Sequence, residues 1–591
     1  MREQKPDAKT ITRLMLRLLP IQVVLAAVGA VNGIVSSFFA TNYVGVEAMS
    51  AVGLYGPVQM LISAVSLMIS GGSVILCGKY LGQNEQKKLQ NVFSLNLTAT
   101  ALLAALFTAL FLLLGLFDLT GFLSGDEQVR PLFNRYLLGQ SIGVFPLLLG
   151  NQLPAFLSME NKGRRTMSAS LIYICVNVVL NFLFVRVLRL EAFGLALASS
   201  LGLWVFFGVE AQYFLSGKST LRITARGIRW SETGEILKTG FPGAANNVYQ
   251  TLRGFILNGL TLAFVGSVGI SAFAAANNLL GIVWALPNGM LAVSRLMMSV
   301  SIGEEDRRSL TDVMRVMFRR FLPMMCAVCA LIIACAVPLT RIFYRDPGQS
   351  VYMMTVWGLR LLPLSMPTAV ICMHFTCYGQ ASGKQALVHL VSLLDGVVCV
   401  AAFAALLIRP MEGMNGVYTA IVLNGVVCAA VFFGYACLKK KGLPRTMDEL
   451  MVVPEDFGAP ESQRMDLSVK SVQEVVSIAE RVQRFCLDKG VDARRAFLAG
   501  LSMEEMAGNI VDHGFTKDDR SHSVDVRVVL KDGDVILRIK DDCVPFDPGE
   551  RQKLAGDGDL TKNIGIRMVF RIARDVQYRN ILGLNVLTLR I

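Results

Sequence analysis

Two sets of polar residues in this sequence have types and spacings that could do chemistry. In the first set, Asn246, Gln250 and Arg253 recur at intervals of four and three residues, which places them on one face of a helix beside Asn247. Asp395 is an acid in the middle of another apolar run. Charged groups at the depth of a bilayer are costly and are kept where they bind a ligand, carry an ion or pair with each other. The sequence therefore predicts a substrate or ion pathway at these five residues, with Asp395 as the acid that couples an ion or binds a cation.

Two alternatives to this pathway remain open. Asn and Gln side chains also join membrane helices by hydrogen bonds without any ligand. Asp395 and Arg253 could form a structural ion pair, in which case neither would move an ion. Glu210 and Arg360 are further charges within apolar runs.

The second set lies near the C-terminal end of the chain. Glu505, Asn509 and His513 are each four residues apart and share one face of a predicted helix. Asp541 ends a predicted strand, and Gly565 opens another predicted helix. The spacing gives the first three residues a common helix face and leaves their chemical roles open.

The apolar segments that carry the first set are long enough to cross a membrane. The chain has 591 residues, of which 53% are hydrophobic and 17% charged, whereas soluble proteins carry about 25% charged residues. A membrane span needs about 20 mostly apolar residues. By that measure the sequence predicts twelve spans, over 14–40, 52–77, 92–117, 133–157, 167–188, 192–215, 236–262, 270–297, 316–341, 355–380, 385–408 and 413–437.

The net charge of +13 is divided unevenly along the chain: residues 1–445 carry +17 and residues 446–591 carry −4. Loops on the side of the N-terminus hold 27 Lys and Arg residues, and the opposite loops hold seven. Basic loops stay in the cytoplasm. The sequence therefore predicts a multi-pass protein of the cell membrane with both termini cytoplasmic. Since topology explains the basic excess, no nucleic-acid partner is predicted.

The two halves of the apolar part repeat each other at an offset of about 221 residues. LGQNEQKKLQNVF (81–93) aligns with IGEEDRRSLTDVM (302–314), and Gly82 aligns with Gly303. Six spans per half is an even number, so the halves run parallel. The predicted fold is an all-α polytopic membrane protein of two six-helix bundles with a C-terminal α/β domain. The predicted division is 1–220 and 221–440 for the bundles, 441–465 for a linker and 466–591 for the α/β domain.

Several segments of the helical part resemble the multidrug and toxic compound extrusion (MATE) family, over roughly residues 10–440. They are VGVEAMSAVGL (44–54), LGQNE (81–85), VNVVLNFLFV (176–185) and FGLALASSLG (193–202). The resemblance implies a secondary transporter that exchanges organic cations or other drugs for Na⁺ or H⁺. Many relatives carry an Asp late in the first helix where this chain has Ser37. The predicted ion pathway therefore includes Ser37 as a position that lacks the usual carboxylate.

After residue 445 the pattern becomes that of a soluble domain. Alternating apolar residues on both sides of a KDGD turn predict a hairpin of two strands. These elements predict an α/β two-layer sandwich, with helices on one face of a mixed sheet. The predicted helices lie in 471–490, 496–514 and 565–576, and the predicted strands lie in 523–542 and 585–591.

This domain resembles the GHKL, or Bergerat-type, ATP-binding domain of histidine kinases, gyrase and Hsp90, and most closely that of anti-sigma-factor serine kinases. The resemblance implies ATP and Mg²⁺ as cofactors. In it, Asn509 holds Mg²⁺ through its amide oxygen, Glu505 is the catalytic residue that orients or deprotonates the attacking hydroxyl, and Asp541 accepts from the adenine amino group. Gly565 and the helix start after it face the phosphates, and Thr588 lies beside Asp541. The implied cofactor-binding set is Asn509, His513, Asp541, Gly565 and Thr588.

Two positions depart from that family pattern. The glycine expected two residues after the adenine Asp is Cys543, and the turn before Gly565 reads Lys-Asn-Ile at 562–564. A Cβ at either place crowds the nucleotide or restricts the turn. Nucleotide binding remains the expectation, and catalytic turnover stays open.

Three functions follow as hypotheses. The leading one is a secondary-active exporter of small organic, cationic substrates with a cytoplasmic ATP-binding regulatory domain that could contact a regulatory protein. The alternatives are a membrane-tethered anti-sigma-like serine kinase and a flippase for a lipid-linked precursor. The chain has no G-x-x-x-x-G-K-[ST] segment, so ATP is not expected to power transport directly. Its four His and twelve Cys show no zinc-ligand spacing, so no structural metal site is predicted.

Overall fold

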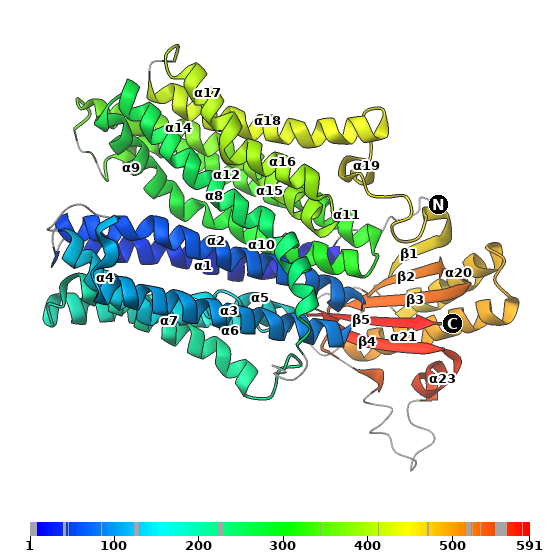
Figure 1. The fold of residues 1–591 in the computed structure, drawn as a ribbon. Coiled ribbons are helices and arrows are strands. Elements are labelled where there is room, and N and C mark those ends of the chain that lie inside the picture. Colours follow the sequence, from blue (N-terminus) through cyan, green and yellow to red (C-terminus); the bar gives the residue numbers. More distant parts are fainter. Residues whose placement is uncertain are drawn as a thin grey trace.

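The helical part and the α/β domain lie end to end. Figure 1 shows two groups of long helices, with the α/β domain packed against one end of both groups, which we call the docked end. The computed structural model describes residues 9–39, 43–44, 46–83, 85–122, 129–222, 228–342, 344, 346–411, 413–469, 472–515, 522, 524–531, 533–545, 547–549, 564–581 and 583–591.

Each predicted membrane span coincides with a helix or a run of adjoining helices. The N-terminal bundle contains α1 (Lys9–Phe39), α2 (Val46–Gln83), α3 (Gln86–Leu116), α4 (Val129–Gly150), α5 (Leu153–Met159), α6 (Gly163–Asn181) and α7 (Glu191–Leu215). The C-terminal bundle contains α8 (Thr233–Phe264), α9 (Ser267–Val283), α10 (Ala285–Gly303), α11 (Arg307–Val316), α12 (Leu322–Ala334), α13 (Ala336–Thr340), α14 (Ser350–Leu361), α15 (Ser365–Ala381), α16 (Gln385–Leu393), α17 (Cys399–Leu407) and α18 (Met414–Lys440). The short helix α19 (Met447–Met451) follows.

Within the described part of the chain, ten helical segments are long and apolar enough to cross a membrane. The pair α9 and α10, bent by 41°, makes an eleventh. The remaining predicted span is α8, a helix of 32 residues whose amides lower its hydropathy. The prediction of an all-α polytopic membrane protein is confirmed.

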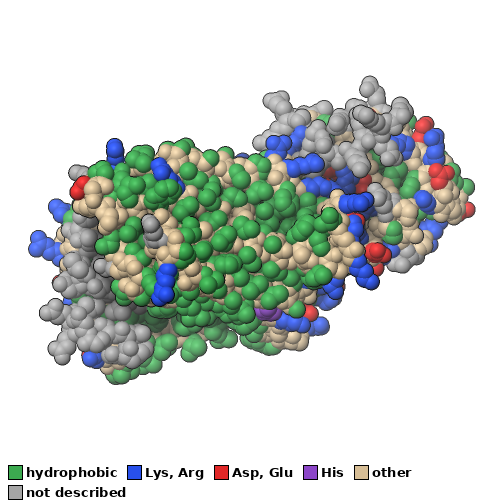
Figure 2. Space-filling view, turned by 90° about the horizontal axis from the view of Figure 1, so that it is seen from above, with side chains coloured by type: hydrophobic (Ala, Val, Ile, Leu, Met, Phe, Trp, Pro, Cys, Tyr) green, Lys and Arg blue, Asp and Glu red, His purple; other side chains and the backbone are tan. Residues whose placement is uncertain are grey.

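The outer surface of the helical part is apolar, as a lipid-facing surface must be. Figure 2 shows hydrophobic side chains covering its middle. On α3, Leu102, Leu106 and Leu113 are exposed by 59%, 62% and 51% and form a stripe on one helix face. Such a surface is stable in contact with hydrocarbon and costly in water.

The two bundles meet tightly at the docked end. Gly72 of α2 and Gly240 of α8 face each other so closely that a Cβ on either would overlap the backbone of the other helix. Gly82 and Gly303, the pair related by the internal repeat, also lie in contact, and a Cβ on Gly303 would overlap the carbonyl oxygen of Lys79. Only glycine allows backbones to approach this closely. The bundles are therefore closed against each other at this end.

The α/β domain is built on a five-stranded sheet in the order β1-β2-β3-β5-β4. All four neighbouring pairs are antiparallel, so the predicted mixed sheet is wrong, while the predicted two-layer α/β sandwich is confirmed. The physical reason is that only two residues separate β2 from β3 and β4 from β5, and so short a connection can join only antiparallel strands. The elements are β1 (Arg464–Val469), α20 (Val472–Asp488), α21 (Ala493–Gly514), β2 (Val524–Lys531), β3 (Asp534–Asp541), α23 (Ile564–Ile572), β4 (Asp575–Ile581) and β5 (Leu584–Arg590).

The two faces of this sheet have different partners. Leu537 and Ile539 of β3 belong to the core beneath the helices of the domain, whereas Arg538 and Lys540 lie on the opposite face, since strand residues alternate. That opposite face packs on the docked end of the helical part, where Val586 joins the hydrophobic core of the bundles. The sheet therefore connects the domain core to the membrane helices.

Candidate functional site

An open cavity of about 630 Å³ lies within the C-terminal bundle, and the first predicted set lines it. Asn246, Asn247, Gln250 and Arg253 come from α8, and Asp395 comes from the segment between α16 and α17. Gln250 Nε2 donates to Asn246 Oδ1 at 2.5 Å, as residues one turn apart on a helix can. The structure places all five residues in the lining of this cavity, while their roles stay predictions.

Asp395 is held by both α18 and α8. Asn424 Nδ2 donates to Asp395 Oδ1 at 2.8 Å, and Arg253 Nη1 lies 3.5 Å from the Asp395 carbonyl oxygen. The guanidinium thus reaches the main chain, and the carboxylate is contacted by a neutral amide. Residues Leu394–Val398 form a π-helical turn, a distortion frequent at functional sites.

The sequence did not single out several polar residues of this cavity. The 27 basic residues assigned to loops on the side of the N-terminus include Arg295, but Arg295 lies on α10, which continues to Gly303. The apolar and small residues of MLAVSRLMMSVSIG (290–303) are the signal that could have placed it within the helix. Among the described lining residues, the charged ones are Arg253, Arg295 and Asp395, so cations outnumber anions by two to one. The other missed residues with amide side chains are Asn277, Asn288, Gln380 and Asn424.

The N-terminal bundle contains a fully buried acid. Glu210 on α7 is 0% exposed, and neither of its carboxylate oxygens meets a hydrogen-bond partner among the described residues. An ionised carboxylate in that position would carry a large desolvation penalty, which protonation removes. The side chain of Ser37 lies outside the described residues, so the prediction there remains untested.

The second predicted set converges in the α/β domain. On α21, Asn509 Nδ2 donates to the Glu505 carbonyl oxygen at 2.7 Å. Gly565, at the start of α23, lies so close to the Glu505 carboxylate that a Cβ there would overlap it. Asn509 and Asp541 line a narrow, mainly apolar pocket of about 40 Å³. The side chain of His513 lies outside the described residues.

Asp541 is fixed at the end of β3 by Asn585 and Cys543. Asn585 Nδ2 and the Cys543 backbone N–H donate to Asp541 Oδ1 at 2.7 and 3.0 Å, and the Cys543 side chain also hydrogen-bonds to Asp541. Burial raises the pKa of Asp541, and the hydrogen bonds from Asn585 and Cys543 oppose the shift. Cys543 lines the same pocket, so its side chain occupies space beside the expected base. Residues 562–563 of the second departure lie outside the described part of the chain.

Thr588 does not lie where the sequence predicted. In the β3–β5 register, Asp541 pairs with Asn585, whereas Thr588 pairs with Arg538. Because side chains alternate between the faces of a strand, Thr588 lies on the face that packs on the helical part. Asn585 occupies the position beside Asp541, and a correct register would have been needed to predict it.

Comparison with known proteins agrees with this architecture. The helical part matches the MatE family model over residues 10–183 and 242–406, which is more than half of the chain. The chain belongs to the MatE family. Residues 468–591 match the model of the histidine kinase-like ATPase domain. This MatE protein therefore contains an ATPase-like domain, formed by residues 468–591, in addition to its membrane helices.

Curated relatives of this MatE protein include two from Bacillus subtilis. It is 25% identical to the probable multidrug resistance protein NorM over 267 residues, covering 43% of this chain and 55% of the relative. It is 24% identical to the probable multidrug resistance protein YpnP over 286 residues, covering 46% of this chain and 61% of the relative. The matched region thus spans between one half and two thirds of these relatives.

Solved structures share the fold of the helical part. An outward-facing multidrug resistance MATE transporter has a TM-score of 0.66 and 20% identity, covering 73% of this chain and 96% of that one. A transporter of the MOP superfamily from Pyrococcus furiosus, described as having a binding pocket of reverse polarity, has a TM-score of 0.66 and 20% identity, covering 74% and 97%. At these identities the likeness shows the fold.

Proposed function

We propose that this MatE protein is a secondary-active exporter of small organic molecules, driven by a Na⁺ or H⁺ gradient and regulated by its ATPase-like domain. The observation that carries the proposal is the polar cavity inside one bundle of a two-bundle membrane fold. Its volume of about 630 Å³ falls in the range of pockets that hold drug-sized ligands. The names of the curated relatives, probable multidrug resistance proteins, support the same class.

The charges of the cavity favour a substrate with an anionic or zwitterionic group over a simple organic cation. Arg253 and Arg295 line it together with Asp395. A guanidinium binds a carboxylate or phosphate with paired hydrogen bonds, whereas a cation bound there would be repelled by two arginines. The substrate class in this proposal therefore differs from the organic cations that the sequence suggested.

Two acids are available to couple an ion. Asp395 lies in the substrate cavity, where substrate and ion would meet. Glu210 is buried in the other bundle, and neither of its carboxylate oxygens has a hydrogen-bond partner among the described residues, which favours the neutral form of the side chain. Both arguments support an ion gradient as the energy source, with a proton gradient the first to test.

We place this protein in the cell membrane with both termini and the ATPase-like domain in the cytoplasm. Once Arg295 is left out, because it lies on α10 in the cavity, the loops on the two sides hold 26 and seven basic residues, and this difference supports the orientation. In this orientation the docked end is cytoplasmic. The glycine contacts close the two bundles against each other at that end, and bundles closed on the cytoplasmic side correspond to an outward-facing conformation.

The energy source is tested with the full chain in proteoliposomes. Dissipating the imposed H⁺ or Na⁺ gradient should abolish export of a fluorescent substrate, while omitting ATP should not, because the substrate cavity lies in the membrane part. An anionic dye such as fluorescein and a cationic dye such as ethidium are compared under the same gradient. Export that follows ATP under a clamped gradient would contradict the proposal, and export of ethidium alone would contradict the substrate class.

The regulatory role rests on how the sheet contacts the C-terminal bundle. Arg527 of β2 forms an ion pair with Asp306, and Lys540 Nζ of β3 lies 2.7 Å from Glu304 and 2.9 Å from Asp306. Asp306 is 2% exposed. Three cations, those of Arg527, Lys540 and Arg538, outweigh the effect of burial and hold the pKa of the Asp306 carboxyl well below its usual range.

The same sheet also contacts the N-terminal bundle. Arg579 of β4 donates to the carbonyl oxygens of Leu81 and Gly82 at 2.8 and 3.2 Å. Segments 81–93 and 302–314, which the internal repeat relates, are thus both bound by one sheet. Transport by rocking requires the bundles to separate at this end. The docked domain therefore stabilises the closed state, and a nucleotide that alters its docking would alter transport.

Removing the charge of Asp306 should loosen this docking. Asp306 Oδ1 accepts from the Ser309 backbone N–H at 2.8 Å and caps α11. Asp306→Asn keeps a capping side chain but removes the charge that faces Arg527 and Lys540, at a cost of about 1–3 kcal/mol. The measurement is the rate at which a protease cleaves the linker 441–465 in the full chain, which should rise. Glu305→Gln is the control, because its pair with Lys531 is more than half exposed on the Glu side and such pairs contribute about 0–1 kcal/mol.

The pH dependence of docking follows from the same contacts. A carboxyl whose folded pKa is depressed contributes stability above its unfolded pKa and loses it only as pH falls through the folded pKa. For Asp306 that pKa lies well below its ordinary 3.8, and the pKa of Lys540 is raised by Asp306 and Glu304 despite its burial. Docking should therefore be constant between about pH 5 and 8, and a loss of docking within that window would contradict the role of Asp306.

A further inference from the structure

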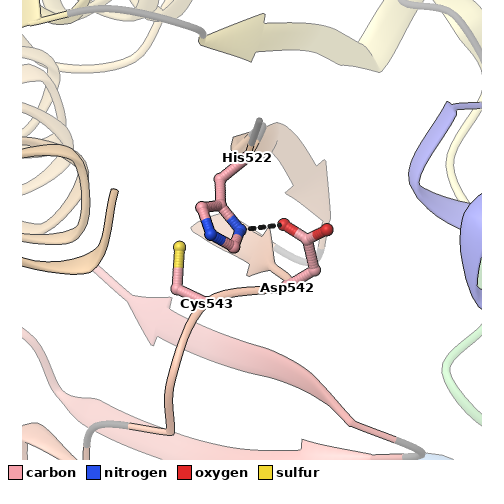
Figure 3. A group of neighbouring side chains, drawn as sticks. All are labelled: His522, Asp542 and Cys543. Atoms are coloured by element: carbon pink, nitrogen blue, oxygen red, sulfur yellow. Dashed lines mark hydrogen bonds and ion pairs between the residues drawn. The ribbon is translucent and has the colours of Figure 1, made fainter. Parts of the chain in front are cut away.

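A cluster of metal-binding side chain types lies beside the nucleotide-like pocket. His522 precedes β2, and Asp542 and Cys543 follow β3 directly, as Figure 3 shows. In the antiparallel register Val524 pairs with Asp541, so the residue before β2 and those directly after β3 lie at the same end of this strand pair. The strand pairing thus brings together residues that are twenty positions apart in the chain.

The three side chains converge closely. One ligand atom from each of His522, Asp542 and Cys543 lies within 4.8 Å of the other two. His522 Nδ1 donates to Asp542 Oδ1 at 3.0 Å, and Figure 3 shows the Cys543 thiol next to the imidazole ring. The His522 side chain is 2% exposed and that of Asp542 is 23% exposed, so the cluster is reached from the side of Asp542.

We propose that His522, Asp542 and Cys543 bind a thiophilic divalent transition metal, with Zn²⁺ as the ion that fits best. Imidazole nitrogen, thiolate sulfur and carboxylate oxygen are all Zn²⁺ ligands, whereas Mg²⁺ and Ca²⁺ take oxygen ligands and would not select the thiol. In a tetrahedral site the ligand atoms lie roughly 3.3–3.8 Å apart, so side-chain movements of about 1–1.5 Å close the cluster. Within the described residues the protein supplies three ligands, and water takes the fourth position.

Metal binding changes the protonation of the cluster. The ion takes the place of the proton between His522 Nδ1 and Asp542 Oδ1, and the neutral imidazole then carries its proton on Nε2. The Cys543 thiol releases its proton to solvent as it becomes a thiolate. Arg13 of α1 lies 3.6 Å from the other oxygen, Asp542 Oδ2. Oδ1 is therefore the metal ligand, and Oδ2 keeps its contact with the membrane helix.

A bound metal would fix the position of Cys543, a side chain that lines the nucleotide-like pocket. Cys543 lines that pocket, and its backbone N–H donates to Asp541 at 3.0 Å. A Cβ added to Gly514 of α21 would lie 3.0 Å from Cys543 Sγ, so the thiol also packs on the helix that carries Asn509. A metal bound to Sγ fixes the side chain that stands in place of the family's glycine, and it fastens the start of β2 to the end of β3.

The test uses the full chain, purified in detergent and stripped of metal with a chelator. Co²⁺ serves as the probe, because it replaces Zn²⁺ and shows a near-ultraviolet charge-transfer band when a thiolate binds it. We expect one Co²⁺ per chain with this band, and its displacement by Zn²⁺. Cys543→Gly and His522→Ala should each remove the band and weaken Co²⁺ binding by at least about tenfold.

Two controls separate the site from other thiols and from misfolding. Cys486→Ser removes a buried thiol of the same domain that lies outside the cluster, and it should leave the band unchanged. Cys543→Gly introduces the glycine that related domains carry at this position. If circular dichroism shows that His522→Ala unfolds the domain, Cys543→Gly alone tests metal binding. A band that persists in Cys543→Gly, or wild-type binding no tighter than that of this variant, would overturn the proposal.

Discussion

Replacing Asp395 by asparagine lowers ion-coupled transport at least tenfold while the protein still reaches the membrane. Asparagine keeps a side-chain oxygen for the Asn424 amide, which donates to Asp395 Oδ1 at 2.8 Å. It also keeps the main-chain oxygen that Arg253 contacts at 3.5 Å. What is lost is the one carboxylate among the described residues of the cavity, the group that can take up a proton or hold Na⁺.

The measurement is export under an imposed gradient, normalised to the amount of variant in the proteoliposomes. Asp346→Asn is the matched control, because Asp346 is an exposed acid in the loop between α13 and α14. Unchanged transport by Asp395→Asn would demote Asp395 to a structural residue. Loss of folded protein would instead favour the structural pair with Arg253, since removing one partner leaves a buried charge uncompensated.

Local periodicity was sufficient to predict one wall of the cavity. Asn246, Gln250 and Arg253 line it together because a helix of 3.6 residues per turn places them on one face. The same amides explain why α8 is less apolar than the other spans. Polar side chains that line a cavity lower the hydropathy of the helix that carries them. A span with weak hydropathy and one polar face therefore indicates a cavity.

Contacts between distant segments could not be predicted in the same way. Asn424 lies 29 residues from Asp395, and its role depends on how α18 packs. Arg295 was misassigned because a single cation near a helix end reads as a loop residue. In the sheet, one unknown register was enough to misplace Thr588, since a shift of an odd number of residues moves a side chain to the opposite face.

The docking face of the sheet shows a further limit of sequence patterns. Arg527, Arg538 and Lys540 alternate with apolar residues, a pattern typical of a sheet with one face in water. In the structure these cations meet Glu304 and Asp306 of the helical part. A strand pattern predicts which residues leave the core, but it does not distinguish water from a charged partner surface. The cluster of His522, Asp542 and Cys543 could not be predicted from the sequence either, because its members become neighbours only through strand pairing.

Replacing Asp541 by asparagine abolishes nucleotide binding without unfolding the ATPase-like domain. The hydrogen bonds from Asn585 and from the Cys543 backbone fall on Oδ1, and an asparagine oxygen can accept both. Its amide nitrogen then replaces Oδ2 and presents a donor to the adenine amino group, which is also a donor. Burial raises the pKa of Asp541, so the charged form is disfavoured in the fold, and a neutral amide relieves that cost.

Titration calorimetry of Mg-ATP into the full chain in detergent checks this result, with thermal unfolding as the control for stability. Asp534→Asn, at the opposite end of β3, is the matched variant and should bind like the wild type. Glu505→Ala should also bind Mg-ATP, because a general base acts on the attacking hydroxyl and not on the nucleotide, although the contact of Glu505 with Gly565 is lost. If the wild-type chain gives no heat, the domain has lost nucleotide binding, and Cys543, which lines the pocket beside Asp541, is the residue that explains the loss. Docking of the sheet on the two bundles would then be the remaining role of the domain.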